Sequence, residues 1–191
     1  MTNNEILDIF NATGGVLKGH FRLTSGRHAD TYMQCAKLFT DAACSEKLCS
    51  ALAEKLSGYG ANIVVSPAVG GILMGYEVSR HLDVPNIFAE RENGKFALRR
   101  GFVLPEDCRA LVVEDVVTTG GSVKEVMELI ALSGGKTAAV GSIVDRSAGK
   151  VNFGVPFESL LSVEIASFEP DNCPICAEGK IPLYKPGSRA L

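Results

Sequence analysis

The stretch that decides the fold is residues 111–122, which read LVVEDVVTTGGS. An apolar run ends in two acids, and a turn of hydroxyl residues and glycines then leads into a helical pattern over 123–132. Outward from it, buried strands are predicted at 63–66, 86–89 and 138–144, with a helix through 73–80 between the first two. Continuous Val, Ile and Ala strands alternating with helices indicate a parallel sheet covered on both faces. The sequence therefore predicts an α/β fold with an open, doubly wound, mostly parallel sheet.

The segments before and after this core have other patterns. A short helix is predicted over Asn3–Thr13, and Asp41 is expected to cap a second helix that continues to Leu56. From Pro156 onward five prolines leave little room for long helices, so strands and loops wrapped over the core are expected. With 191 residues the chain is expected to form a single domain, 1–191.

Composition and charge exclude several classes of function. Nineteen Lys and Arg against 22 Asp and Glu give a net charge of −3, which argues against binding of nucleic acid or of an anionic membrane. The apolar stretch 63–76 is interrupted by Pro67 and by glycines, and it is shorter than the ~20 residues that span a bilayer. No signal peptide is recognisable, so a cytoplasmic protein is expected.

The turn over Thr118–Ser122 has the chemistry of a phosphate site. Glycines let backbone N–H groups curl around an anion, hydroxyls donate to its oxygens, and the following helix N-terminus adds a favourable dipole. Ser122 with Glu125 also fits a capping box, which is a structural alternative for that serine. The preceding acids, Glu114 and Asp115, suit Mg²⁺, a diol, or both.

Six cysteines are scattered along the chain, and one pair, Cys173 and Cys176, has the spacing of a motif. A structural zinc site needs four ligands, and the histidines, at 20, 28 and 81, are far away in sequence. Two reduced thiols in a C-terminal turn are therefore preferred over zinc or redox chemistry.

Residues 112–122 resemble the phosphoribosyl-diphosphate (PRPP) motif of the type I phosphoribosyltransferases. Other segments resemble one branch of these enzymes, the orotate phosphoribosyltransferases. Residues 21–28 with 30–32 look like its base-covering hood, 67–71 like its diphosphate loop, and 89–92 like the start of its mobile catalytic loop. Asp145 and Arg146 end the strand after the motif helix, where the family places an arginine on the orotate carboxylate, and residues 173–189 resemble the ending of a bacterial and archaeal subgroup.

This resemblance implies transfer of a phosphoribosyl group from PRPP to orotate, giving orotidine 5′-monophosphate and diphosphate in pyrimidine (UMP) synthesis. It implies Mg²⁺ as cofactor, held mainly by PRPP, and a homodimer whose loop reaches the neighbouring site. The hood is expected from about 14–40 and 156–191. Catalytic roles fall to Lys95, Asp115 and Glu114, and orotate binding falls to Thr118 and Arg146. The implied PRPP contacts are Arg91, Lys95, Glu114, Asp115, Val116, Val117, Thr118, Thr119, Gly120, Gly121 and Ser122.

The sequence departs from the family at several positions. Thr24 and Gly70 stand where many members carry lysine, and the loop after Glu90 has no histidine. Arg91 and Lys95 are therefore the candidates for the diphosphate. Arg99 and Arg100 lie behind them, and a solvated basic turn is the alternative for these two. For Arg146 the alternative is a structural ion pair with an acid such as Asp145 or Glu164.

Two other functions remain open at this point. A phosphoribosyltransferase for another base, such as adenine, xanthine or uracil, would keep the phosphate turn and differ in the hood and near Arg146. A non-catalytic PRPP-sensing regulator is less favoured, because no helix-turn-helix fits before the hood and the net charge is −3.

Overall fold

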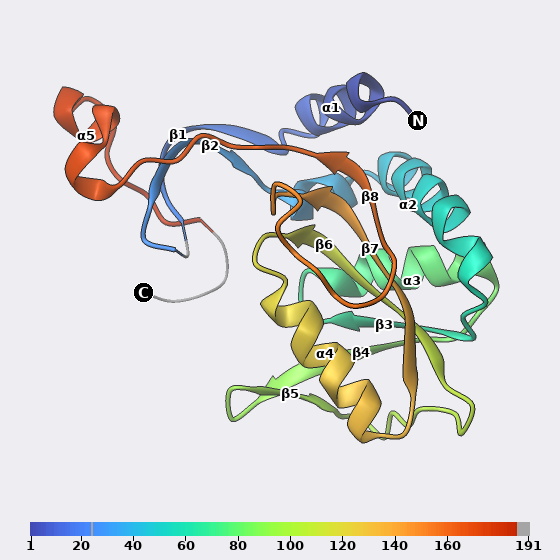
Figure 1. Cartoon of the computed structure of the whole chain (residues 1–191). Coiled ribbons are helices and arrows are strands. Elements are labelled where there is room, and N and C mark those ends of the chain that lie inside the picture. Colours follow the sequence, from blue (N-terminus) through green and yellow to red (C-terminus); the bar gives the residue numbers. More distant parts are fainter. Residues whose placement is uncertain (24, 187–191) are drawn as a thin grey trace.

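The computed structural model describes residues 1–23 and 25–186. Thr24 and the last part of the expected hood, 187–191, lie outside the described residues. The main sheet has the strand order β5-β4-β3-β6-β7-β8 and is parallel except where β4 pairs with β5 (Figure 1). Its strands are β3 (Ile63–Pro67), β4 (Asn86–Glu92), β5 (Lys95–Leu98), β6 (Arg109–Val117), β7 (Lys136–Asp145) and β8 (Phe157–Ser162).

Helices cover both faces of this sheet, as expected for a doubly wound fold (Figure 1). One face packs against α1 (Asn3–Ala12), α2 (Ala42–Leu56) and α3 (Gly71–Leu82) through residues such as Phe10, Leu52 and Met74. The other packs against α4 (Gly121–Leu132) through Val123 and Ile130. None of the helices in the described part of the chain has the length and apolarity needed to cross a bilayer.

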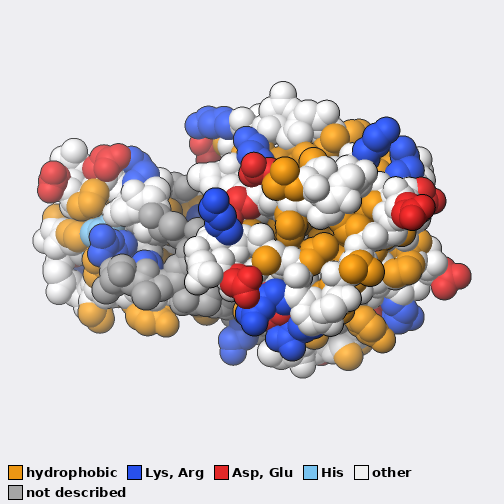
Figure 2. Space-filling model, turned by 90° about the horizontal axis from the view of Figure 1, so that it is seen from below, with side chains coloured by type: hydrophobic (Ala, Val, Ile, Leu, Met, Phe, Trp, Pro, Cys, Tyr) orange, Lys and Arg blue, Asp and Glu red, His pale blue; other side chains and the backbone are white. Residues whose placement is uncertain are grey.

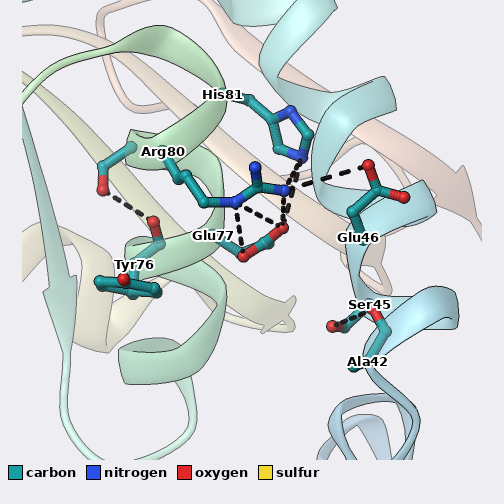
Figure 3. Close-up of polar contacts among 8 residues, drawn as sticks. Ala42, Ser45, Glu46, Tyr76, Glu77, Arg80 and His81 are labelled. Atoms are coloured by element: carbon teal, nitrogen blue, oxygen red, sulfur yellow. Dashed lines mark hydrogen bonds and ion pairs between the residues drawn. The ribbon is translucent and has the colours of Figure 1, made fainter.

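Asp41 caps α2 as predicted, since its carboxylate accepts hydrogen bonds from the backbone N–H groups of Ala43 and Cys44. Arg80 donates to Glu77 of the same helix, α3, at 2.6 Å and lies 4.0 Å from Glu46 of α2 (Figure 3). Such exposed pairs contribute little. The buried contacts of these helices therefore hold them together.

A smaller lobe lies beside the core, seen at the upper left of Figure 1 and at the left of Figure 2. It is an antiparallel hairpin of β1 (Val16–Arg22) and β2 (His28–Met33), joined by a C-terminal segment. This segment includes η3 (Pro170–Asn172) and α5 (Pro174–Glu178), while η1 (Cys35–Thr40) and η2 (Ser57–Tyr59) flank α2. We call residues 16–33 with 166–186 the hairpin lobe.

The C-terminal segment pairs with both edges of the hairpin. His28 and Phe168 exchange two backbone hydrogen bonds, each 2.8 Å long. On the other edge Arg22 N donates to Tyr184 O, and Tyr184 N donates to His20 O, both at 2.9 Å. The two ends of the chain are thus joined in one small structure.

The sequence analysis located the parallel core and missed its edges. Part of the tail expected to wrap over the core is instead β8, the edge strand next to β7. The β1–β2 hairpin and β5 were also not predicted as strands. Each of these strands has one neighbour in its sheet, so it lacks the continuous apolar pattern of a buried strand.

Candidate active site

Three adjacent parallel strands end at the same edge of the sheet. β3 ends before Ala68–Gly70, β6 before Thr118–Gly120, and β7 before Arg146. Ligands of open α/β sheets bind beyond such carboxyl ends. Segments that are far apart in the sequence therefore line one place in the fold.

The turn after β6 presents backbone donors. Gly120 is the N-cap of α4 with φ 73°, and as a glycine it offers no capping side chain. The first N–H groups of a helix have no partner within it, so those of α4 can bind an anion. The hydroxyl-bearing residues Thr118 and Thr119 are exposed beside them.

Gly120 is required by both conformation and space. Its φ lies in the left-handed region, and an added Cβ would meet the ring of Phe153 at 2.8 Å. The position of Ser122 inside the helix shows that its capping box with Glu125 is wrong. Glu125 instead pairs with Arg91.

Asp115 lies between the β3 and β6 loops. Its carboxylate oxygens are 3.1 and 3.2 Å from the point where a Cβ on Gly70 would stand. Burial raises the pKa of Asp115, although the backbone N–H of Val116 donates to its Oδ1 at 2.9 Å. Within residues 1–23 and 25–186 it has no ion pair with Lys or Arg. This carboxylate is suited to a ligand that brings hydroxyls or a cation.

The neighbouring site residues of β6 have different environments. Glu114 is half-buried, Val116 packs against the α2–α3 side of the core, and Val117 is buried on the α4 side. Val117 pairs with Asp145 of β7, so Thr118 and Arg146 follow side by side at the strand ends. The backbone N–H of Arg146 donates to Val117 O at 2.7 Å, which fixes this arrangement.

The Arg146 guanidinium is half-buried and short of partners. Its Nε is buried without a hydrogen-bond partner, and burial lowers the pKa of the group. The alternative of an ion pair with Asp145 or Glu164 is not found in the described part of the chain, and Asp145 accepts from Ser147 N at 2.7 Å instead. A buried charge without an anion is costly, so Arg146 is prepared for an anionic ligand.

Arg91 and Lys95 lie on a tight hairpin where the resemblance suggested a mobile loop. β4 and β5 are joined by Asn93 and Gly94 with φ values of 52° and 83°, as in a two-residue turn. Arg91 donates to both carboxylate oxygens of Glu125, at 2.9 and 3.1 Å, and its guanidinium lies 4.2 Å from the Phe96 ring centroid. Lys95 is exposed near the tip.

The two basic residues behind this hairpin are paired with acids of β4. Arg99 lies 3.4 Å from Glu92, and Arg100 lies 2.7 Å from Glu90. In this conformation Arg99 and Arg100 therefore form ion pairs within the β4–β5 region.

Some neighbours of the site were not among the predicted site residues, although two of them lie in the expected hood, 14–40. Cys35 approaches Asp115 O at 3.8 Å, and Tyr32 lies within electrostatic reach of Arg146. The ring of Phe153 backs Gly120. These residues come from segments far from the motif, and only folding brings them to it.

Two surface depressions, of about 460 and 450 Å³, lie away from the strand ends. One is bordered by Tyr76, Arg80 and Asn86, and the other by Arg22, His28 and Glu169 of the hairpin lobe. Neither is bordered by the phosphate turn. The chemistry at the strand ends, and not a depression, identifies the site.

Comparison with known proteins agrees with this geometry. Residues 38–164 match the model of the phosphoribosyl transferase domain. The orotate phosphoribosyltransferase of Caldanaerobacter subterraneus subsp. tengcongensis is 53% identical over 191 residues, covering 100% of both chains. That of Thermotoga petrophila is 50% identical over 186 residues, covering 97% of this chain and 99% of the other. The chain belongs to the orotate phosphoribosyltransferase family.

Solved structures share its fold at lower identity. The orotate phosphoribosyltransferase of Aeropyrum pernix matches with a TM-score of 0.71 and 23% identity, over 83% of this chain and 93% of that one. An adenine phosphoribosyltransferase from Thermoanaerobacter pseudethanolicus matches with a TM-score of 0.61 and 19% identity, over 70% and 88%. The fold is therefore common to enzymes of different bases. Membership of the orotate phosphoribosyltransferase family rests on the full-length relatives of 50% and 53% identity, and not on the shared fold.

We predict that Gly120→Ala destabilises this orotate phosphoribosyltransferase fold and that Gly121→Ala does not. A side chain at the left-handed Gly120 costs about 1–2 kcal/mol in conformation, and its clash with Phe153 adds about 1–3 kcal/mol. At Gly121 the nearest atom to an added Cβ is Thr119 Oγ1 at 3.7 Å. Urea unfolding followed by circular dichroism measures both. Equal stability of the two variants would contradict the role given to Gly120.

Proposed function

We propose that this chain transfers the 5-phosphoribosyl group of PRPP to orotate, giving orotidine 5′-monophosphate and diphosphate for UMP synthesis. The observation that carries the proposal is the meeting of three groups at adjacent strand ends. These are the phosphate turn, the acids that precede it, and the guanidinium of Arg146, which has no counter-anion among the described residues.

The phosphate turn would hold the 5-phosphate of PRPP. The N–H groups of Gly121 and Ser122 at the start of α4, with the hydroxyls of Thr118 and Thr119, supply donors without a lysine. Glu114 and Asp115 precede this turn on β6, so a ribose attached to the phosphate would extend over them. Carboxylates accept hydrogen bonds from ribose hydroxyls.

The site also suits Mg²⁺, the cofactor that the family resemblance implies. Asp115 offers a partly buried carboxylate of raised pKa without an ion pair in the described chain, and Mg²⁺ prefers oxygen ligands and substrate phosphates. Glu114 and Asp115 would support the ion while PRPP supplies most of its ligands. Bound Mg²⁺ would neutralise part of the diphosphate charge.

The reaction separates charge, and the remaining residues are assigned accordingly. Diphosphate leaves with several negative charges while the ribose becomes oxocarbenium-like, so cations at the diphosphate and carboxylates beside the ring lower the barrier. Lys95 and Arg91 are proposed for the diphosphate. Arg91 would exchange Glu125 for the phosphates.

Arg146 and Thr118 would select the base. Orotate carries a carboxylate that uracil lacks, and a planar guanidinium binds a carboxylate through two parallel hydrogen bonds. The neighbouring strand ends place Thr118 beside that contact. The hairpin lobe would cover the base as the family hood.

We further propose that the protein is a homodimer in the cytoplasm, with Lys95 and Arg91 completing the partner's site. Exposed apolar side chains support an interface at α3: Leu73 and Tyr76, three residues apart on this helix, are 58% and 62% exposed, and Val69 just before it is 78% exposed. Lys95 is at a protruding hairpin tip, from which it can reach another subunit.

We predict that the purified protein consumes orotate with PRPP and Mg²⁺ and leaves uracil, adenine, hypoxanthine and xanthine unchanged. Spectrophotometric assays of the five bases in parallel measure this, and EDTA is expected to abolish turnover until Mg²⁺ is restored. Turnover of another base would reassign the substrate. Binding of PRPP without any turnover would instead support the regulator.

We predict that Arg146→Gln raises the KM for orotate while the KM for PRPP is kept. Loss of a charge-assisted contact of about 1.5–3 kcal/mol corresponds to about 10–150-fold. Arg109→Gln is the matched control. Arg109 begins β6 and so lies at the amino ends of the parallel strands, away from the site, where its side chain donates to Gly60 O and Tyr59 O. Steady-state kinetics measure both. Unchanged orotate affinity in Arg146→Gln would remove this residue from base selection.

We predict that Lys95→Ala lowers kcat about 10²–10³-fold while the fold is kept, since it removes one aimed electrostatic contact. Lys136→Ala is the control and is expected to keep normal turnover, because Lys136 begins β7 at the amino ends of the parallel strands, away from the site. If Lys95 acts across the dimer, mixing Lys95→Ala with Arg146→Ala, at an orotate concentration too low for Arg146→Ala to turn over, restores about a quarter of wild-type activity, because half of randomly paired dimers contain one intact site of two. No recovery after subunit exchange would place Lys95 in its own subunit's site.

A further inference from the structure

Two histidines and two cysteines meet in the hairpin lobe. His20 is on β1 and His28 on β2, while Cys173 precedes α5 and Cys176 lies within it. Their four ligand atoms all lie within 4.8 Å of one another. The sequence analysis preferred two reduced thiols because the histidines are far away in sequence. In the fold, backbone pairing of the hairpin with the C-terminal segment brings these histidines beside the two cysteines.

The distances have the size of a tetrahedral coordination sphere. His20 Nε2 lies 3.0 Å from His28 Nδ1 and 3.6 Å from each of the sulfurs of Cys173 and Cys176. Cys176 Sγ lies 3.3 Å from His28 Nδ1. Zinc bonds of about 2.0–2.3 Å at tetrahedral angles place ligand atoms roughly 3.3–3.8 Å apart. The four atoms can thus surround one ion with small adjustments.

The orientation of His20 gives a second observation. Its Nδ1 is 3.1 Å from the carbonyl oxygen of Ile181, which can only accept, so Nδ1 carries the proton and Nε2 turns a lone pair toward the cluster. A histidine ligand of a metal is commonly held in this way by a backbone carbonyl. Ile181 belongs to the same C-terminal segment as the cysteines.

Hydrogen bonds alone do not satisfy these four groups. With its proton on Nδ1, His20 offers a single lone pair at Nε2, while His28 Nδ1 and two sulfurs all approach that atom. His20, His28 and Cys173 are 3%, 5% and 3% exposed, so water is nearly excluded from three of the four. A cation at the centre would satisfy all four atoms at once.

We propose that His20 Nε2, His28 Nδ1 and the thiolates of Cys173 and Cys176 bind one Zn²⁺ as a structural site. Two sulfurs and two nitrogens in tetrahedral arrangement select zinc among the common divalent ions. Protein atoms fill all four positions, so no place is left for a substrate or a reactive water. Binding releases the two thiol protons to solvent and changes no oxidation state.

The ion would fasten the C-terminal segment to the hairpin. α5 spans Pro174–Glu178, too few residues for a helix to be stable by itself. Exposed ion pairs such as Arg27 with Glu169 contribute little to this junction. The zinc site would therefore add a strong link to the backbone hydrogen bonds that already join the C-terminal segment to the hairpin. This inference does not depend on which base the enzyme uses.

Metal analysis of the full-length protein tests the proposal. After purification without chelators, inductively coupled plasma mass spectrometry is expected to find about one zinc per chain. Cys176→Ser and His28→Gln are expected to lower that content about tenfold or more. The matched controls are Cys44→Ser and His81→Gln, a thiol on α2 and a histidine on α3 outside the cluster, and both are expected to keep the metal.

A second measurement covers the case in which the ligand variants fail to fold. Co²⁺ exchanged into the wild-type protein is expected to show the intense visible bands of tetrahedral coordination with a thiolate charge-transfer band, displaced by one equivalent of Zn²⁺. Protein that takes up neither ion under reducing conditions would overturn the proposal. So would metal retained in full by folded Cys176→Ser and His28→Gln.

Discussion

The parallel pairing of β6 with β3 and β7 is the constraint on which the site depends. Because these neighbouring strands run in one direction, their carboxyl ends finish side by side. The hydrogen bond from Arg146 N to Val117 O extends the β6–β7 pairing just past the end of β7. It aligns the turn that precedes α4 with the guanidinium of Arg146. Loss of this register would separate the phosphate donors from the group proposed to bind the base.

The charged side chains of the β4–β5 hairpin and those at the carboxyl ends of the strands have different surroundings. Those of the β4–β5 hairpin are paired with acids: Arg91 with Glu125, Arg99 with Glu92, and Arg100 with Glu90. At the strand ends burial raises the pKa of Asp115 and lowers that of Arg146. Groups whose charged forms are disfavoured by burial gain when a ligand supplies the missing charge. An anionic ligand would therefore stabilise Arg146, whereas Asp115 would be stabilised by a cation or by hydroxyl donors.

Local patterns were enough to predict the core of the fold. Continuous apolar strands, the cap at Asp41 and the motif over 111–122 each depend on residues that are close in the sequence, and the structure confirms the parallel sheet and its helices. The Ser122–Glu125 capping box was wrong because Gly120 already occupies the N-cap and Arg91 takes Glu125. That competition comes from another strand and has no local signal.

The parts that could not be predicted depend on distant pairing. β5 and β8 have a neighbouring strand on one side only, and the outer edges of β1 and β2 bond to single residues of the distant C-terminal segment, so their sequences lack the continuous apolar pattern of a buried strand. The meeting of His20 and His28 with Cys173 and Cys176 requires both ends of the chain. For the site residues, sequence indicated which segments meet at the sheet edge, whereas the contact of Gly70 with Asp115 and that of Phe153 with Gly120 needed coordinates.

The pairing of the hairpin with the C-terminal segment has a consequence for synthesis on the ribosome. β1 and β2 are made before the main sheet, whereas Phe168 and Tyr184, to which their outer edges bond, are made after it. The strands of the main sheet, from β3 to β8, all lie between these two segments in the sequence, so the whole sheet is made before the hairpin's C-terminal partners. Contacts between residues so far apart in the sequence form slowly, because the chain loses the entropy of closing the loop before the contacts stabilise it. The hairpin thus leaves the ribosome before the main sheet but completes its native pairing only after that sheet has been made, and its outer edges must stay soluble in the meantime.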